Sequence, residues 1–482
     1  MVKSLRRATV RSPKRVKAPP PRRTSKESRI IRLIRLFEES LAKLGARMPP
    51  DQLERRALLI HRVMTAASRG FHQLDHVFEV AEGLAPAEAL AAIYHDTVYA
   101  QIDQGIAPDV YERIKDDIWV EGSRYFVKRA RPDDSAALVA EIFDAAPGSE
   151  LSLLRGMNEH LSALLAVKEL SIALPEAVLA EIAAAIEQTI PFRGDNADGQ
   201  SAAEALAGRL GKLSQRRRWG WSPDDLDEVV RRCVSLGNND VWGFAADDPA
   251  LFLDGTWKLL AEANPELHTI GVYSIRHFRI ALQKMERFLG GLKPQVVFHE
   301  YRDYPDRKTW RDLQKRTTAN LATAVHYLRV KLLAMAVLEA LAELTGGDAP
   351  VAFFLGSSRE VEPDTFQLHE LLPPPEQEVA DLVLDNTLLQ LFETGRRSRA
   401  KFDTRGSPLS AYLYKMVGKS GITRLMTRAR RTFDGDLSWE QFLDGMPAGF
   451  VTEMAAAAAQ IAVTRTEKLV AIADRARARK RR

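Results

Sequence analysis

Cysteine is nearly absent from this 482-residue sequence, and long uninterrupted apolar runs are missing. The single cysteine, Cys233, has no partner for an internal disulfide and cannot alone supply the thiolates of a cysteine-only metal site. The longest apolar stretches, near 332–341 and 455–463, fall short of the ~20 residues that cross a bilayer. The basic N-terminus is not followed by the apolar segment of a secretory signal. We therefore expect a protein of a reducing compartment, without a membrane span, and place it in the cytoplasm.

Acidic side chains are almost missing from three basic segments. Residues 1–26 contain ten basic and no acidic side chains, residues 396–431 eleven basic and one acidic, and residues 475–482 six basic ones. Residues 27–395 carry 40 basic and 56 acidic side chains, so the net charge of +5 hides an acidic body. Cationic segments attract nucleic acid through a salt-sensitive field, but they also serve as solubilising tails or as partners for an acidic body. Both interpretations of the basic segments stay open.

The domain organisation follows from composition. Residues 1–27 hold few large apolar side chains and three successive prolines at 19–21, so they are predicted to form a disordered basic arm. Residues 28–345 carry the apolar spacing of successive helices and are predicted to form the main domain. Three more prolines at 373–375 predict a linker over 346–377. Residues 378–482 are predicted to form a smaller C-terminal helical module with a basic tail.

The spacing of apolar residues predicts an all-α protein. Several segments begin with proline or an acidic residue and end at glycine, as helices prefer. The one strand candidate is the short apolar segment 349–355. Helices are expected at 30–44, 52–68, 71–82, 86–94, 110–130, 134–145, 150–170, 175–188, 202–213, 223–236, 248–263, 271–289, 309–346 and 379–394.

Histidines gather in one short part of the chain. His72 and His76 lie four residues apart in the sequence FHQLDHV, a spacing that puts both imidazoles on one face of a helix. His95 and Asp96 follow at the end of the next predicted helix, in LAAIYHDTVY. A divalent metal explains the cluster economically, because imidazole and carboxylate together suit Zn, Mn, Fe or Ni. The alternative is a set of ordinary core or surface histidines.

These motifs resemble those of the HD superfamily of metal-dependent phosphohydrolases, in particular a bacterial branch described only as predicted phosphohydrolases. The resemblance spans about residues 29–345 and implies an HD-domain-like helical bundle. It also implies that His76, His95 and Asp96 bind one divalent metal ion, whose identity (Mn, Fe, Zn, Ni or Mg) the sequence leaves open. The fourth ligand of the family, a downstream aspartate, matches best at Asp240 in CVSLGNNDVWGFA. Asp240 could instead be a surface acid that caps the next helix.

The same resemblance implies a mechanism of phosphoester hydrolysis and the residues that would carry it out. A metal held by two imidazoles and two carboxylates would activate a water molecule against a phosphorus centre, and His72 would protonate the leaving group. His72 could also be a structural histidine that supports the metal site. Arg193, in the sequence TIPFR, is a candidate for binding the substrate phosphate, or else a surface arginine in a turn between helices.

The sequence departs from the motifs of better-defined branches of the HD superfamily, and these departures narrow the expected substrate and the expected number of metal ions. The sequence HDTVY lacks the Gly-Lys that follows His-Asp in cyclic-di-GMP hydrolases, which disfavours that substrate. Only His160 lies between the His-Asp pair and Asp240, so one metal is expected rather than the two of the di-iron oxygenases. We expect hydrolysis of a small phosphorylated or nucleotide-like substrate. The competing hypothesis is a non-catalytic HD scaffold that binds nucleic acid or a protein partner through its basic segments.

Overall fold

A computed structural model describes residues 27–131, 134–268, 273–356, 366–376, 384–398, 400 and 402–480. α-Helices make up most of these residues, and the strands among them form one three-stranded antiparallel sheet. The all-α prediction is therefore confirmed. The predicted N-terminal arm lies outside the described residues, except for Glu27.

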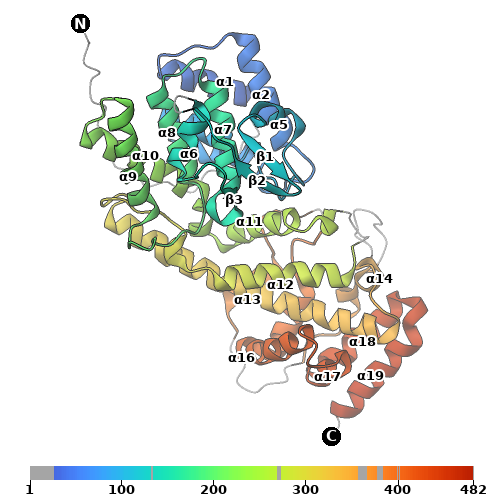
Figure 1. Ribbon diagram of the computed structural model, residues 1–482. Coiled ribbons are helices and arrows are strands. Elements are labelled where there is room, and N and C mark those ends of the chain that lie inside the picture. The colour runs from blue at the N-terminus through green and yellow to red at the C-terminus, as the bar shows by residue number, and fades with distance from the viewer. Residues whose placement is uncertain are drawn as a thin grey trace.

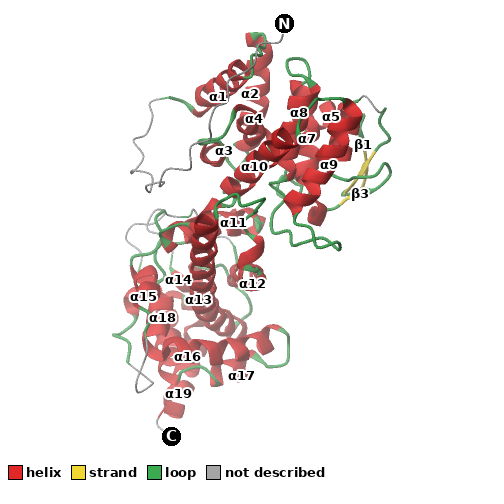
Figure 2. Ribbon diagram, turned by 90° about the vertical axis from the view of Figure 1, so that its left-hand side faces the viewer, coloured by secondary structure: helices red, strands yellow, loops and turns green. Residues whose placement is uncertain are grey.

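The first ten helices and the sheet pack around one hydrophobic core, which contains buried residues from Leu33 to Leu236. They form the upper part of the molecule in Figures 1 and 2. The helices of this first core are α1 (Arg29–Lys43), α2 (Pro50–Met64), α3 (Leu74–Val80), α4 (Pro86–Tyr94), α5 (Pro108–Ile114), α6 (Ser135–Ile142), α7 (Met157–Leu170), α8 (Glu176–Glu187), α9 (Ala202–Arg217) and α10 (Pro223–Asp240).

The remaining helices pack around a second core, whose buried residues run from Ala250 to Ala476. The 39-residue helix α13 runs through this part of the molecule (Figure 2). The helices of the second core are α11 (Pro249–Glu262), α12 (Ile275–Gly291), α13 (Arg307–Thr345), α14 (Ala352–Leu355), α15 (Asn386–Glu393), α16 (Pro408–Phe433), α17 (Trp439–Asp444), α18 (Ala448–Ile461) and α19 (Thr466–Lys480).

The division between the cores differs from the predicted domain boundary at residue 345. The first core ends at Leu236 along the chain, apart from Tyr301, and the second begins at Ala250. Helices α11 to α13 therefore belong with the C-terminal helices. The sequence pattern shows that α13 is amphipathic or buried but not which helices cover it, so the grouping of the helices into cores could not be predicted, and the domain boundary after 345 stays a prediction. Within the predicted linker, Phe354 and Leu368 are buried in the second core.

The helix predicted at 110–130 is wrong. Helix α5 ends at Ile114, and the chain continues as the hairpin of β1 (Ile118–Glu121) and β2 (Arg124–Val127). The two strands consist mainly of β-branched and aromatic residues, and the turn between them contains Gly122 at φ +62°. Strand-forming residues on both sides of a glycine turn favour a β-hairpin, and this preference outweighs the approximate helical spacing of the apolar residues.

Two further predictions need correction. The predicted helix 150–170 begins only at Met157, because Glu150–Leu151 form β3 beside β2 and Gly156 adopts a left-handed conformation at φ +74°. The predicted strand 349–355 is mostly the short helix α14. Only Pro350 makes a β-bridge there, with Ser274.

Helix α13 is the one helix in the described ranges that is long and apolar enough, by length and composition, to cross a membrane. Of its most apolar window, 72% is buried inside the protein. This burial is what the central helix of a soluble protein shows, because neighbouring helices cover its apolar surface.

A buried ion pair links α12 and α13. Arg279 donates from Nε and Nη2 to the two carboxylate oxygens of Glu339, at 2.6 and 3.0 Å, and Glu339 is fully buried. We predict that Glu339→Ala lowers the free energy of unfolding by about 3–5 kcal/mol, because it leaves the Arg279 charge buried without an oppositely charged partner. Chemical denaturation measures the change.

The matched control is Glu343→Ala on the same helix. Glu343 pairs at 2.5 Å with Arg276, whose side chain is 47% exposed, so its removal should cost at most about 1 kcal/mol. Equal losses from the two variants would contradict the assignment of a desolvated pair at Glu339.

Candidate metal centre

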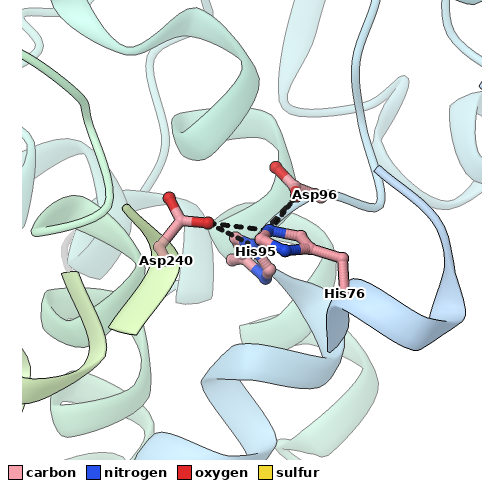
Figure 3. A group of neighbouring side chains, drawn as sticks. All are labelled: His76, His95, Asp96 and Asp240. Atoms are coloured by element: carbon pink, nitrogen blue, oxygen red, sulfur yellow. Dashed lines mark hydrogen bonds and ion pairs between the residues drawn. The ribbon is translucent and has the colours of Figure 1, made fainter. Parts of the chain in front are cut away.

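Four side chains from three separate segments converge in the first core. His76 comes from α3, His95 and Asp96 from the end of α4, and Asp240 from the last residue of α10. Figure 3 shows the four side chains pointing toward one another. One potential ligand atom from each lies within 4.8 Å of all the others. The residues that the sequence predicted as metal ligands are thus brought together.

The interatomic distances suit a single ion. His76 Nε2 lies 2.9 Å from Asp240 Oδ1, and His95 Nε2 lies 2.9 Å from Asp96 Oδ2. The cross distances are 3.3 Å from His95 to Asp240 and 3.6 Å from His76 to Asp96. Ligand bonds of about 2.1 Å to one cation separate the donor atoms by about 3 to 4 Å. Small side-chain shifts therefore suffice to close the cluster around an ion.

Two buried donor atoms of the cluster, His95 Nε2 and Asp96 Oδ2, have no hydrogen-bond partner outside the cluster in the described part of the chain. His95 Nδ1 lies 2.8 Å from the Ala92 carbonyl oxygen, which can only accept, so Nδ1 carries a proton and Nε2 is the nitrogen that faces the two carboxylates. Buried polar atoms without partners are costly. A divalent cation would satisfy both atoms, so the donor set fits a metal ion.

The electrostatics of the site depend on the pairing of imidazoles with carboxylates. Burial raises the pKa of Asp240, but hydrogen bonds to His76 and His95 outweigh burial and lower the pKa to about 2. For Asp96, burial is likewise outweighed by the neighbouring imidazoles, above all His95, and its pKa lies far below the usual value. Both carboxylates are therefore charged at neutral pH and attract a cation.

His72 is not on the helix that carries His76, contrary to the prediction. Helix α3 begins at Leu74, and His72 lies in the segment before it, where the backbone hydrogen bonds go to a side chain from the second core rather than into a helix. Its Nδ1 lies 2.6 Å from Glu262 Oε1, and its ring packs edge-on against Tyr99 at 4.5 Å. Burial lowers the pKa of His72, but Asp96 and Glu262 outweigh burial and raise it.

A buried arginine holds the backbone of the segment that contains His95 and Asp96. Arg69 donates to the carbonyl oxygens of Asp96 and Thr97, at 2.7 and 3.3 Å, and its charge is paired with Asp103 at 2.5 Å. Its side chain is fully buried. Carbonyl groups after the end of a helix have no helical partners, so Arg69 holds the backbone that carries the candidate ligand Asp96.

Helix α7 holds the other side of the same segment. The hydroxyl of Ser162 accepts a hydrogen bond from the Val98 N–H at 3.0 Å, and Asn158 Oδ1 accepts one from the Ala100 N–H at 3.1 Å. These side chains take the place of backbone partners for a buried, non-helical stretch.

The last turn of α10 is built to place Asp240. Asn238 donates to the His299 carbonyl at 2.9 Å and accepts from the His299 N–H at 2.7 Å. Asn239 donates to the Val80 carbonyl at the end of α3, at 3.0 Å. Both asparagines thus lie inside α10 and bind backbone groups of distant segments.

Arg193 is held by an acid of the first core. Its Nη1 donates to Glu187 Oε1 at 2.7 Å, and Nη2 donates to the Glu187 carbonyl at 2.9 Å. Arg209 also pairs with Glu187, at 2.7 Å. Both terminal nitrogens of Arg193 are thus engaged, and a role in binding the substrate phosphate stays a prediction that this geometry does not favour.

The basic C-terminal residues are largely paired within the protein. Arg475 pairs with Glu440, Arg479 with Asp444 at 3.0 Å, and Lys480 with Glu376 at 2.5 Å. On α16, side chains of three arginines line a surface hollow of about 370 Å³. They are Arg424, Arg428 and Arg431.

Residues that support the site were missed from the sequence. Arg69 and Glu262 contact it from 27 and 190 residues away, and no local pattern predicts such contacts. Asn238 and Asn239 also support the site, and for them the usable sequence signal is their position directly before the predicted ligand Asp240. No family model, curated protein or solved structure matches this chain.

We predict that Asp96→Asn lowers the affinity for a divalent ion such as Mn²⁺ by at least ~100-fold. Changes to residues that only support metal ligands typically cost 10–100-fold, and Asp96 supplies both a ligand atom and a charge. Isothermal titration calorimetry measures the affinity. The matched control is Asp75→Asn, one residue before His76, because Asp75 lies outside the cluster and pairs with exposed Arg29. Equal affinities for wild type and Asp96→Asn would contradict the site.

Gly237 gives a second test of the site. A Cβ atom at this position would lie 2.5 Å from the Gln188 carbonyl oxygen, so α10 can approach this closely only with glycine. We expect Gly237→Ala to displace α10 and Asp240 and to weaken metal binding by about 10–100-fold. Gly208→Ala in α9 is the control, since nothing lies within 4 Å of its Cβ position. The interpretation is wrong if both alanine variants bind Mn²⁺ like wild type.

Proposed function

We propose that this protein is a metal-dependent phosphohydrolase of the HD type, which acts on a small phosphorylated or nucleotide-like substrate. The observation that carries the proposal is the buried group of two imidazoles and two carboxylates, in which His95 Nε2 and Asp96 Oδ2 have no hydrogen-bond partner outside the group among the described residues. Such a donor set is suited to a divalent transition metal. The spacing of these residues in the sequence, which resembles that of HD phosphohydrolases, supports the same reaction type.

In this proposal His76, His95, Asp96 and Asp240 hold the metal. A divalent ion bound there supplies Lewis acidity, which favours attack of water on a phosphorus centre. The two carboxylates carry the charge that retains the ion, and the hydrogen bond between Nδ1 of His95 and the Ala92 carbonyl keeps Nε2 free for it.

His72 supplies the proton in this proposal. It lies beside the ligands without being one of them, with its ring 5.8 Å from that of His76. A bond forms between the water oxygen and phosphorus, and the bond from phosphorus to the leaving oxygen breaks. The leaving oxygen keeps the electron pair and takes the proton from His72, while the proton of the attacking water passes to solvent.

The proposed function is tested with a set of phosphoesters and each candidate metal. We expect hydrolysis that needs Mn, Fe, Zn, Ni or Mg, that EDTA abolishes, and that His72→Gln lowers by about 10²–10⁴-fold on substrates with poor leaving groups. Product phosphate or alcohol is measured. Wild-type protein that binds metal at the four residues but hydrolyses no ester would contradict the proposal and favour a non-catalytic HD scaffold.

A further inference from the structure

A carboxylate from the second core holds the segment that carries His72. Glu262 is the last residue of α11 and is 2% exposed. Its Oε2 accepts hydrogen bonds from three successive backbone N–H groups, those of Gly70, Phe71 and His72, at 3.0, 2.6 and 3.3 Å. Three donors on one carboxylate oxygen fix the path of this segment, because charge-assisted bonds are the strong ones.

The other oxygen of Glu262 acts on the His72 side chain itself. Oε1 lies 2.6 Å from Nδ1 of His72. A charged carboxylate can only accept, so Nδ1 carries a hydrogen, and Nε2 is the nitrogen left to exchange a proton at the site. The edge-on contact with Tyr99, at 4.5 Å, limits rotation of the ring.

Two glycines allow the close contact between the segment and α11. A Cβ atom on Gly70 would lie 3.0 Å from the Lys258 carbonyl oxygen, and one on Gly255 would lie 3.4 Å from the ring of Phe71. The segment therefore packs directly against the helix that ends in Glu262. This packing is a contact between the two cores, since α11 belongs to the second.

We propose that Glu262 is the positioning residue for His72, and that the proton donor is assembled from both cores while the metal ligands all come from the first. Glu262 fixes the tautomer of His72 and the position of its ring through one hydrogen bond, and the backbone of the segment through three. The inference rests on the proposed function in so far as His72 protonates a leaving group. Its structural part, the tautomer of His72, stands without that reaction.

The kinetic test compares two esters with different leaving groups in wild type, Glu262→Gln and His72→Gln. The glutamine keeps the shape, and its carbonyl oxygen can still accept from the backbone, but its NH₂ group faces Nδ1 and favours the opposite tautomer. We expect Glu262→Gln to slow hydrolysis of phenyl phosphate by about 10–100-fold. Hydrolysis of 4-nitrophenyl phosphate, whose leaving group needs little protonation, should change by less than about 3-fold.

The same split between esters is expected for His72→Gln. A residue with a merely structural role would slow both esters equally, and that outcome overturns the proposal. Glu266→Gln is the matched control, an exposed glutamate four residues further along the chain, and should leave both rates unchanged. Metal content should equal that of wild type in Glu262→Gln and in the control, because neither residue belongs to the ligand cluster.

A spectroscopic test separates this inference from the proposed function. In metal-free wild-type protein with ¹⁵N-labelled histidine, at a pH where the His72 ring is neutral in both proteins, we expect the His72 signal, assigned with His72→Gln, to show a protonated, hydrogen-bonded Nδ1. In Glu262→Gln the proton should move to Nε2. An unprotonated Nδ1 in wild type, or the same tautomer in both proteins, overturns the proposal. If neither ester is hydrolysed but the tautomer switches, the proposed function fails and the positioning role stands.

Discussion

The structure of the site depends on the meeting of two carboxylates and two imidazoles in a largely buried place. Burying charge is costly unless it is paired, and two carboxylates brought together repel each other. Without a metal, His76 and His95 offset this cost in part by hydrogen bonding and charge, as the pKa of about 2 for Asp240 indicates. His95 Nε2 and Asp96 Oδ2 have no hydrogen-bond partner outside the cluster within the described chain. A divalent cation removes the repulsion and satisfies both atoms at once.

The rest of the fold keeps these atoms together. Arg69 and α7 hold the segment after α4, and two asparagines and a glycine hold the last turn of α10 against its neighbours. None of these contacts joins residues close in sequence. The second core adds Glu262, which fixes the segment that carries His72. The candidate metal ligands and the neighbouring histidine are therefore positioned by different cores, although they lie side by side in space.

The sequence predicted the all-α class and the four side chains that converge, because histidine spacing and helix periodicity are local patterns. His76, His95 and Asp96 follow from such patterns together with a family resemblance, and Asp240 follows from that resemblance matched on sequence context, without a tight spacing. The hairpin at Ile118–Val127 was missed because turn chemistry there competes with helical spacing. The division between the cores, the role of Glu262 and the ion pair of Arg193 could not be predicted, since each depends on which distant segments pack together.

Crystals grown with Mn²⁺ and measured at the manganese absorption edge test the central claim most directly. The account predicts one anomalous peak in the first core, about 2.1–2.3 Å from a donor atom of each of His76, His95, Asp96 and Asp240. A peak elsewhere, a second peak of equal height beside it, or no peak at all would contradict the claim that these four residues hold one cation.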